Sequence, residues 1–198
     1  MRRSKIISRV HAQGAISGGL LTLAVLVVTG CGGDESIDGP SSVPSRLSNA
    51  DKQACVAAIN AVRASVIQPA NYTGSWSALP DMTWSDAVAA SAQGWADYLA
   101  SHGCKLEHAS NTGYGENLAL GTRLTASNAV AMWASEIDRY TWSANYSAAD
   151  FNAGSGHYTQ LVWRSTVEVG CGIAECNASV IVSCRFSPPG NSLGTAAY

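Results

Sequence analysis

The hydrophobic residues of this chain recur with two different periods, and this change constrains the fold more than any other feature. Before residue 156, apolar residues recur at helical spacing in three segments. Two later segments alternate apolar residues with small or polar ones, and they contain Val167, Val169, Cys171 and Ile173, then Val180, Val182, Cys184 and Phe186. We expect these two segments to form a hairpin that turns near Asn177. Helices first and antiparallel strands late predict an α+β domain with helices against a sheet.

Three helices are predicted ahead of the strands. Ser48, with Asp51 three residues later, is typical of a helix start, and Ser85 and Ser127 precede the two other helices. Glu136 shares the apolar side of the third helix, so we expect it to have a partner, because burying an unpaired charge is costly. The three apolar stripes are Cys55, Ile59, Val62 and Val66; Val88, Ala92, Trp95 and Leu99; and Val130, Trp133, Ile137 and Tyr140.

The first 30 residues are predicted to be an export signal. A basic head precedes an uncharged apolar run over 15–28, which is short for a membrane span. The run ends in Val-Thr-Gly-Cys31, which resembles a bacterial lipobox and implies cleavage before Cys31 and its lipidation; an ordinary signal peptide is the alternative. Residues 31–47 are predicted to be a flexible tether and 48–198 the folded domain. We therefore expect a lipoprotein anchored at the outer membrane or cell surface, or otherwise a secreted protein.

The charge and the cysteine content of the chain exclude two further kinds of function. Four of the 12 basic side chains lie within the signal, against none of the 14 acidic ones, so the mature chain is acidic. An acidic domain lacks the positive patch with which proteins bind nucleic acid. No CxxC occurs, so a zinc–cysteine site is not expected. In an oxidising compartment most of the remaining five cysteines should pair, and the odd number leaves at least one thiol; they are Cys55, Cys104, Cys171, Cys176 and Cys184.

Two histidines and one glutamate stand in unusual settings. His108 follows Cys-Lys-Leu-Glu, and His157 opens a run that leads into the strands. Glu116 follows two glycines, which predicts a tight turn that aims its carboxylate. These residues are candidates for a polar site.

Five sequence motifs occur in a fixed order and together cover most of residues 51–191. They are Gly115-Glu-Asn-Leu118, Trp133-Ala-Ser-Glu136, Gly156-His-Tyr-Thr-Gln-Leu-Val-Trp163, Val169-Gly-Cys-Gly172 and Val182-Ser-Cys-Arg-Phe-Ser-Pro-Pro-Gly-Asn191. In this order they resemble the CAP superfamily of secreted sperm-coating, venom-allergen and plant pathogenesis-related proteins. The resemblance implies a three-layer α-β-α sandwich with a central antiparallel sheet.

The resemblance also implies a site. In that family two histidines and two glutamates line a central cavity, which in several members holds zinc or a similar divalent ion. The matching residues are His108, Glu116, Glu136 and His157, and two imidazoles with two carboxylates suit zinc or another divalent cation. The alternative is a hydrogen-bonded network that locks the helices onto the sheet without metal.

The resemblance further implies two disulfides and a structural role for two residues of the first helix. The disulfides would be Cys104–Cys176 and Cys171–Cys184, and the helix residues are Asn60 and Arg63. Cys55 is then left over, either as a buried thiol or as a replacement for one partner.

Three functions are compatible with these residues, and a binding module is favoured over catalysis. Family members bind sterols or fatty acids in a loop, and the matching segment, 140–151, carries Trp142, Tyr146 and Phe151, which would line a lipid site or pin the loop to the core. The second hypothesis is a metal-dependent hydrolase, a peptidase with Glu116 or Glu136 as its base. The third is an interaction scaffold displayed at the cell surface.

Overall fold

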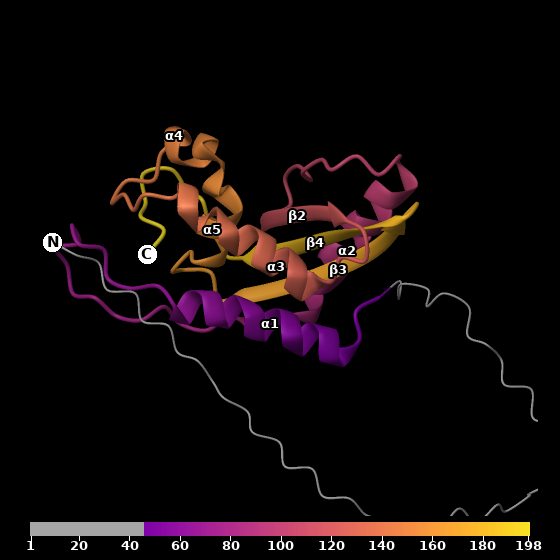
Figure 1. Cartoon of the computed structure of the whole chain (residues 1–198), viewed down its shortest axis with the longest axis horizontal. Helices are drawn as coiled ribbons and strands as arrows, with labels where there is room; N and C mark the ends of the chain where they lie inside the picture. The colour runs from indigo at the N-terminus through magenta and orange to yellow at the C-terminus, as the bar shows by residue number, and fades with distance from the viewer. Residues whose placement is uncertain (1–45) are drawn as a thin grey trace, which may run out of the picture. The chain divides into compact units, whose positions relative to one another are not determined.

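A computed structural model describes residues 46–198 of the protein. The predicted signal peptide, the lipidation site at Cys31 and nearly all of the tether lie outside this range. Within it, no helix is both long and apolar enough to cross a membrane. The elements in chain order are α1 (Asn49–Ala64), β1 (Thr83–Trp84), α2 (Asp86–Ser101), β2 (Gly115–Gly121), α3 (Ala126–Ala134), the 3-10 helix η1 (Ser135–Arg139), α4 (Ala148–Asp150), the π-helical turn η2 (Phe151–Ser155), α5 (Gly156–Leu161), β3 (Glu168–Cys176) and β4 (Ser179–Ser187) (Figure 1).

The four described strands form one sheet in the order β1-β3-β4-β2. β3 and β4 make the predicted hairpin, in which Cys176 pairs with Ser179. Asn177 lies in the turn with a φ of 55°, a conformation that asparagine tolerates. β2 runs antiparallel to β4, whereas the two residues of β1 pair with β3 in parallel. The central sheet is therefore antiparallel except at the short β1.

Helices cover both faces of the sheet, which confirms the three-layer α-β-α fold (Figure 1). One core contains Ile59 of α1 and Trp133 of α3 together with apolar residues of β3 and β4. The other contains Leu99 of α2, packed with Leu118 and Ile181. Burial of apolar surface on both faces is the main stabilising contribution to such a fold.

Because both faces are covered, the alternation in β3 and β4 does not separate a buried face from an exposed one. The polar residues Ser183 and Arg185 are buried in β4. In β3 the alternate residues Gly170 and Gly172 let α2 approach the backbone of the sheet. An added Cβ at Gly172 would lie 2.3 Å from the Cα of Gln93, closer than non-bonded atoms pack.

The first helix begins as predicted. The side chain of Ser48 accepts a hydrogen bond from the backbone N–H of Asp51, whose carboxylate bonds back to Ser48. The helix ends at Ala64, so Val66 of the predicted stripe lies beyond it. Ser85 is the residue before α2, although its side chain makes no capping hydrogen bond.

The predicted third helix differs at both ends. Thr125 caps α3, two residues before Ser127, and accepts a hydrogen bond from the N–H of Asn128 at 3.1 Å. The α-helix stops at Ala134 and continues as the 3-10 turn η1. A 3-10 helix has three residues per turn instead of 3.6. Ile137 therefore turns out of the predicted stripe and is exposed, while Glu136 is buried.

Five short elements were not predicted: β1, β2, α4, η2 and α5. β2 contains Glu116, so the carboxylate comes from a strand and not from a tight turn. The turn lies earlier, where Gly113 has a φ of 75°. α5 begins at Gly156 and places His157 in its first turn.

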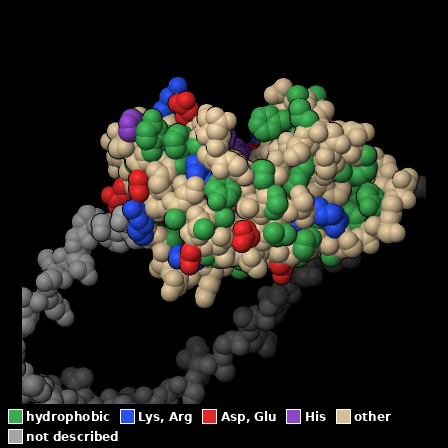
Figure 2. Space-filling model, turned by 180° about the vertical axis from the view of Figure 1, so that it is seen from behind, with side chains coloured by type: hydrophobic (Ala, Val, Ile, Leu, Met, Phe, Trp, Pro, Cys, Tyr) green, Lys and Arg blue, Asp and Glu red, His purple; other side chains and the backbone are tan. Residues whose placement is uncertain are grey.

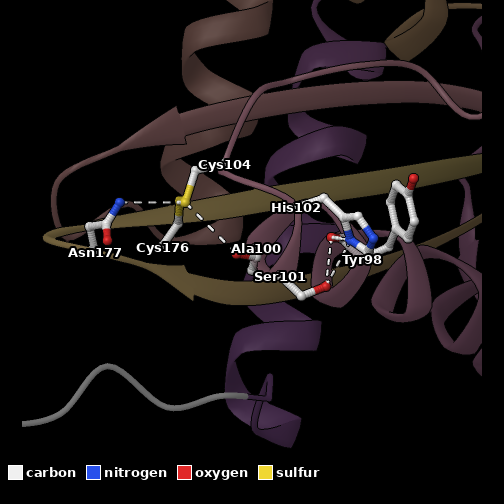
Figure 3. The surroundings of a disulfide bond; sticks show 7 residues. All are labelled: Tyr98, Ala100, Ser101, His102, Cys104, Cys176 and Asn177. Carbon is white, nitrogen blue, oxygen red and sulfur yellow. Dashed lines mark hydrogen bonds between the residues drawn. A yellow bond between two sulfur atoms is a disulfide. The ribbon is translucent and has the colours of Figure 1, made fainter.

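Both disulfides implied by the resemblance are present. Cys104–Cys176 joins the segment after α2 to the end of β3, next to Asn177 of the hairpin turn (Figure 3). Cys171–Cys184 links β3 to β4 at directly paired positions, with Cα atoms 4.1 Å apart. Cys55 is a buried free thiol.

Two polar side chains of α1 have the structural role that the resemblance implies. Asn60 exchanges two hydrogen bonds with the backbone of Met82, at 3.0 and 2.8 Å. Arg63 is fully buried. Its guanidinium donates to four backbone carbonyl oxygens, those of Pro80, Leu161, Trp163 and Thr166, at 2.7 to 3.3 Å.

Candidate functional site

The four predicted site residues line one cavity of about 450 Å³. They come from separate elements: His108 from the loop before β2, Glu116 from β2, Glu136 from η1 and His157 from α5. The surface view shows a notch in the domain with a histidine inside it (Figure 2). The fold therefore brings together residues that are up to 49 positions apart in sequence.

His108 and Glu116 form the first pair. The imidazole Nδ1 lies 2.9 Å from Oε1 of Glu116, and the backbone N–H of Ala109 donates to the same oxygen at 3.1 Å. The other carboxylate oxygen accepts from Nε and Nη2 of Arg185, both at 3.3 Å. Arg185 also donates to Ser91 of α2. The carboxylate is thus fixed between the sheet and the His108 loop.

Glu116 changes the protonation of His108. The hydrogen bond to its carboxylate raises the pKa of His108 above the ordinary value, desolvation lowers it, and the negative charge of Glu116 raises it further. The net shift is upward. The imidazolium form of His108 is therefore favoured up to a higher pH than in an isolated histidine.

His157 and Glu136 form the second pair. Nδ1 of His157 lies 2.7 Å from Oε1 of Glu136. Oε2 accepts from the backbone N–H groups of His157 and Tyr158, at 3.0 and 3.2 Å, in the first turn of α5. Arg139 lies 3.8 Å from the same carboxylate. The buried charge of Glu136 has the partners that we expected.

Both pairs have the same chemistry. Each imidazole has its Nδ1 against a carboxylate, and Nε2 has no hydrogen-bond partner among residues 46–198. A carboxylate behind Nδ1 places the ring proton there in neutral imidazole and leaves the lone pair on Nε2. Each carboxylate oxygen already accepts hydrogen bonds from the protein. The four residues thus make two separate His–Glu pairs. Among residues 46–198, the one group of three or more possible metal-ligand atoms within 4.8 Å of one another is formed by other residues, Cys55, Cys171 and Cys184.

Two further polar residues position this site and were not singled out from the sequence. Arg185 holds Glu116, and Asn117 donates from Nδ2 to the backbone carbonyl of His157 at 3.1 Å. Both lie inside quoted motifs. A signal for them was therefore present, but their partners are far away in the chain.

Of the three residues of the predicted lipid site, Trp142 and Tyr146 do not line the cavity of the two His–Glu pairs. Trp142 donates from Nε1 to the carbonyl of Tyr198, and Tyr146 is buried against Trp163. These two side chains pin the loop to the core. Phe151 is half exposed and lines the cavity of the two His–Glu pairs. Of the three, Phe151 is the one at the candidate site.

Comparison with known proteins agrees with the fold and the motifs. Residues 56–186 match the model of CAP, the cysteine-rich secretory protein family. The chain belongs to the CAP family. Pathogenesis-related protein 1C of Nicotiana tabacum is 48% identical over 120 residues, which are 59% of this chain and 69% of that protein. The PR-1-type protein of Sambucus nigra is 39% identical over 155 residues, 73% of this chain and 91% of that protein.

Solved CAP-domain structures show the same architecture. NaASP2, whose crystal structure was determined with Zn²⁺, superposes with a TM-score of 0.64 at 25% identity and covers 76% of this chain and 86% of its own. BmVAL-1 superposes with a TM-score of 0.63 at 26% identity, over 78% and 84%. The relationship to a family of secretory proteins, together with two disulfides, supports the predicted export of this CAP protein.

Proposed function

We propose that this protein is an exported binding module whose cavity binds a divalent metal ion, with zinc as the best match. The observation that carries the proposal is the repeated His–Glu arrangement. In one cavity, two imidazoles have Nδ1 bonded to a carboxylate and Nε2 without a partner. Metal-binding histidines typically have such a carboxylate behind them.

The donor set fits zinc. Nε2 of His108 and of His157 would hold the ion, and water would complete its coordination. Glu116 and Glu136 would orient the two rings through Nδ1. His108 must lose its Nε2 proton before it can bind metal. Because its pKa is raised, this loss requires a higher pH than in an isolated histidine. A bound divalent ion would polarise an oxygen atom of a ligand in the cavity. The zinc in the NaASP2 crystal structure supports the same choice.

The carboxylates favour binding over hydrolysis. A general base must be free to take a proton from water, whereas both oxygens of Glu116 and of Glu136 are hydrogen-bonded to the protein. Peptidase activity of the zinc-loaded protein would support the hydrolase hypothesis if Glu116→Gln or Glu136→Gln abolished it without loss of the metal.

Isothermal titration of the metal-free full chain with zinc chloride at neutral pH tests the proposal. We expect one zinc per chain, and at least tenfold weaker binding in His108→Ala and in His157→Ala. His102→Ala is the matched control, because His102 stacks on Tyr98 beside the Cys104–Cys176 disulfide (Figure 3) and does not line the cavity. Unchanged binding in both cavity variants would refute the proposal.

A small apolar ligand is a second candidate, and Phe151 supports it. Its half-exposed ring lines the same cavity as the histidines, and apolar ligands bind where aromatic side chains meet a few polar groups. We expect Phe151→Ala to weaken binding of a labelled fatty acid or sterol. Ile67→Ala is the control, since Ile67 is also exposed but does not line the cavity. Equal binding by both variants would eliminate Phe151 as a lipid contact.

Membrane anchoring through Cys31 is part of the proposal and rests on the sequence Val28-Thr29-Gly30-Cys31. Mass spectrometry of the N-terminal peptide should find a diacylglyceryl modification on Cys31, and Cys31→Ser should move the protein from the membrane fraction to the soluble fraction. An unmodified Cys31 in the mature chain would remove the anchor and leave the rest of the proposal standing.

A further inference from the structure

Three cysteine sulfurs lie together in the core between α1 and the sheet. Cys55 comes from α1, Cys171 from β3 and Cys184 from β4, and the three Sγ atoms lie within 4.8 Å of one another. Cys171 and Cys184 form a disulfide. The free Sγ of Cys55 lies 3.5 Å from Sγ of Cys171. A free thiol is thus in van der Waals contact with a disulfide sulfur.

We propose that Cys55 is an internal exchange partner of this disulfide, so that Cys171 can pair with either Cys184 or Cys55. In the exchange, the thiolate of Cys55 attacks Sγ of Cys171 and forms a new S–S bond. The bond between Cys171 and Cys184 breaks, and its electron pair leaves on Cys184. Cys184 then takes up the proton that Cys55 lost. The reaction needs no oxidant or reductant, because the numbers of thiols and disulfides stay the same.

The surroundings of Cys55 direct it to this partner. Cys55 is fully buried in the core formed with Ile59 and the sheet, so a thiol dissolved in the solvent has no direct path to it. Holding two reacting groups in contact replaces a bimolecular encounter with an intramolecular one. Burial also raises the pKa of the Cys55 thiol to about 12. The thiol form is therefore the resting form, and exchange is slow in the undisturbed protein.

Cys171 is 3% exposed, so a thiol from the solvent reaches its sulfur only when the surrounding structure opens. It lines a surface groove together with Lys52 of α1 and Gln93 of α2. A small thiol that attacked Cys171 there would form a mixed disulfide and release Cys184 as a thiol. Cys55 could then attack Cys171, form the Cys55–Cys171 disulfide and expel the small thiol. After the exchange, a disulfide would join β3 to α1 instead of to β4.

Disulfide mapping of Cys184→Ala in the exported full chain tests the proposal. The protein is quenched in acid, alkylated and digested without reduction, and its cysteine peptides are identified by mass spectrometry. We expect a Cys55–Cys171 disulfide in the folded variant, with Cys31 identified on its own peptide. The matched control is Cys55→Ala/Cys184→Ala, in which Cys171 should be alkylated. If Cys55 and Cys171 are both alkylated in folded Cys184→Ala, or if Cys171 pairs with Cys31, the proposal is wrong.

A second measurement on the unmodified sequence covers the case in which Cys184→Ala does not fold. The native chain is incubated with dilute reduced glutathione at mildly alkaline pH, and samples are quenched and alkylated under denaturing conditions at intervals. We expect the alkylated cysteine to shift with time from Cys55 to Cys184, with a Cys55–Cys171 disulfide in the same samples. Label that stays on Cys55 alone, while Cys171–Cys184 persists, would overturn the proposal.

Discussion

Glu116 is the residue on which the protonation of the candidate site depends most. Its carboxylate binds His108 on one side and Arg185 on the other. We expect Glu116→Gln to lower the pKa of His108 toward its ordinary value, because both the charge and the strong hydrogen-bond acceptor are lost. An NMR titration of the His108 ring measures this shift. Glu107→Gln, next to His108 but outside the pair, should leave the pKa of His108 unchanged. The same pKa in all three proteins would show that Glu116 does not raise it.

The raised pKa of His108 also gives the sign of its contribution to stability. A histidine with a higher pKa in the folded than in the unfolded chain stabilises the fold fully below the unfolded pKa, near 6.5, and this stabilisation is lost as pH rises through the folded pKa. The imidazole is 59% exposed, so solvent screening keeps the effect small. The difference in unfolding free energy between the native chain and His108→Ala should therefore decrease from pH 6 toward pH 8.

Arg63 is the residue with the largest expected effect on stability. Four backbone carbonyl oxygens depend on its buried guanidinium, and burial lowers its pKa to about 10. Arg63→Ala would remove all four hydrogen bonds, and of these acceptors the Trp163 carbonyl would keep the N–H of Thr166 as a donor. We therefore expect a loss on the order of 4 kcal/mol in unfolding free energy. Urea denaturation measures it. The exposed Lys105→Ala should cost less than about 0.5 kcal/mol, and equal midpoints for the two variants would be inconsistent with this role.

At the level of elements, the contact between α2 and β3 is the most sensitive to added volume. We expect Gly172→Ala to lower the unfolding free energy by about 1–3 kcal/mol, because its Cβ would overlap the backbone of Gln93. Gly94→Ala is a control that should change the unfolding free energy in the opposite direction. Gly94 lies within α2 with no atom near its added Cβ, so alanine should stabilise the helix by up to about 1 kcal/mol. Urea midpoints that moved the same way would argue against this packing.

Elements with a local signal were predictable from the sequence, whereas elements defined by distant contacts were not. The Ser48 capping box and the alternation before and after Asn177 identify α1 and the hairpin. β2 has no such signal, because its pairing is with β4, about 65 residues later in the chain. α5 has only six residues and is buried on most sides, so it shows no helical period.

In the candidate site, too, part was predictable from the sequence and part was not. Its two histidines and two glutamates were identified from motifs that resemble the CAP family. Their spacing in the sequence did not predict how the four side chains are arranged in space. That each histidine pairs with one glutamate through Nδ1 became visible only in the fold. The role of Arg185 depends on a contact between residues 69 positions apart, which no local pattern encodes.

At the level of the whole molecule, the Cys104–Cys176 disulfide joins parts of the domain 72 residues apart in sequence. A crosslink over such a span restricts the unfolded chain and stabilises the fold by roughly 2–5 kcal/mol. We expect Cys104→Ala/Cys176→Ala to lose an amount in this range in a urea titration, while keeping zinc binding, because neither residue lines the cavity. Loss of zinc binding in a folded double variant would show that the hairpin end and the cavity are coupled.

The cavity itself is a property of the whole domain, since its side chains come from a loop, a strand, a 3-10 turn and a helix. A ligand that binds the folded state alone stabilises it, by about 2.7 kcal/mol at a hundred times its dissociation constant. Zinc should therefore raise the stability of the native chain and have no such effect on His108→Ala/His157→Ala.

Zinc binding by the cavity can be counted by native mass spectrometry of the purified full chain, after incubation with zinc and removal of the excess. If the two His–Glu pairs bind zinc, the native sequence and His102→Ala each carry one zinc ion per chain, and His108→Ala/His157→Ala carries none. A native chain without zinc, or a double variant that retains it, would contradict the assignment of the two His–Glu pairs as a metal-binding site.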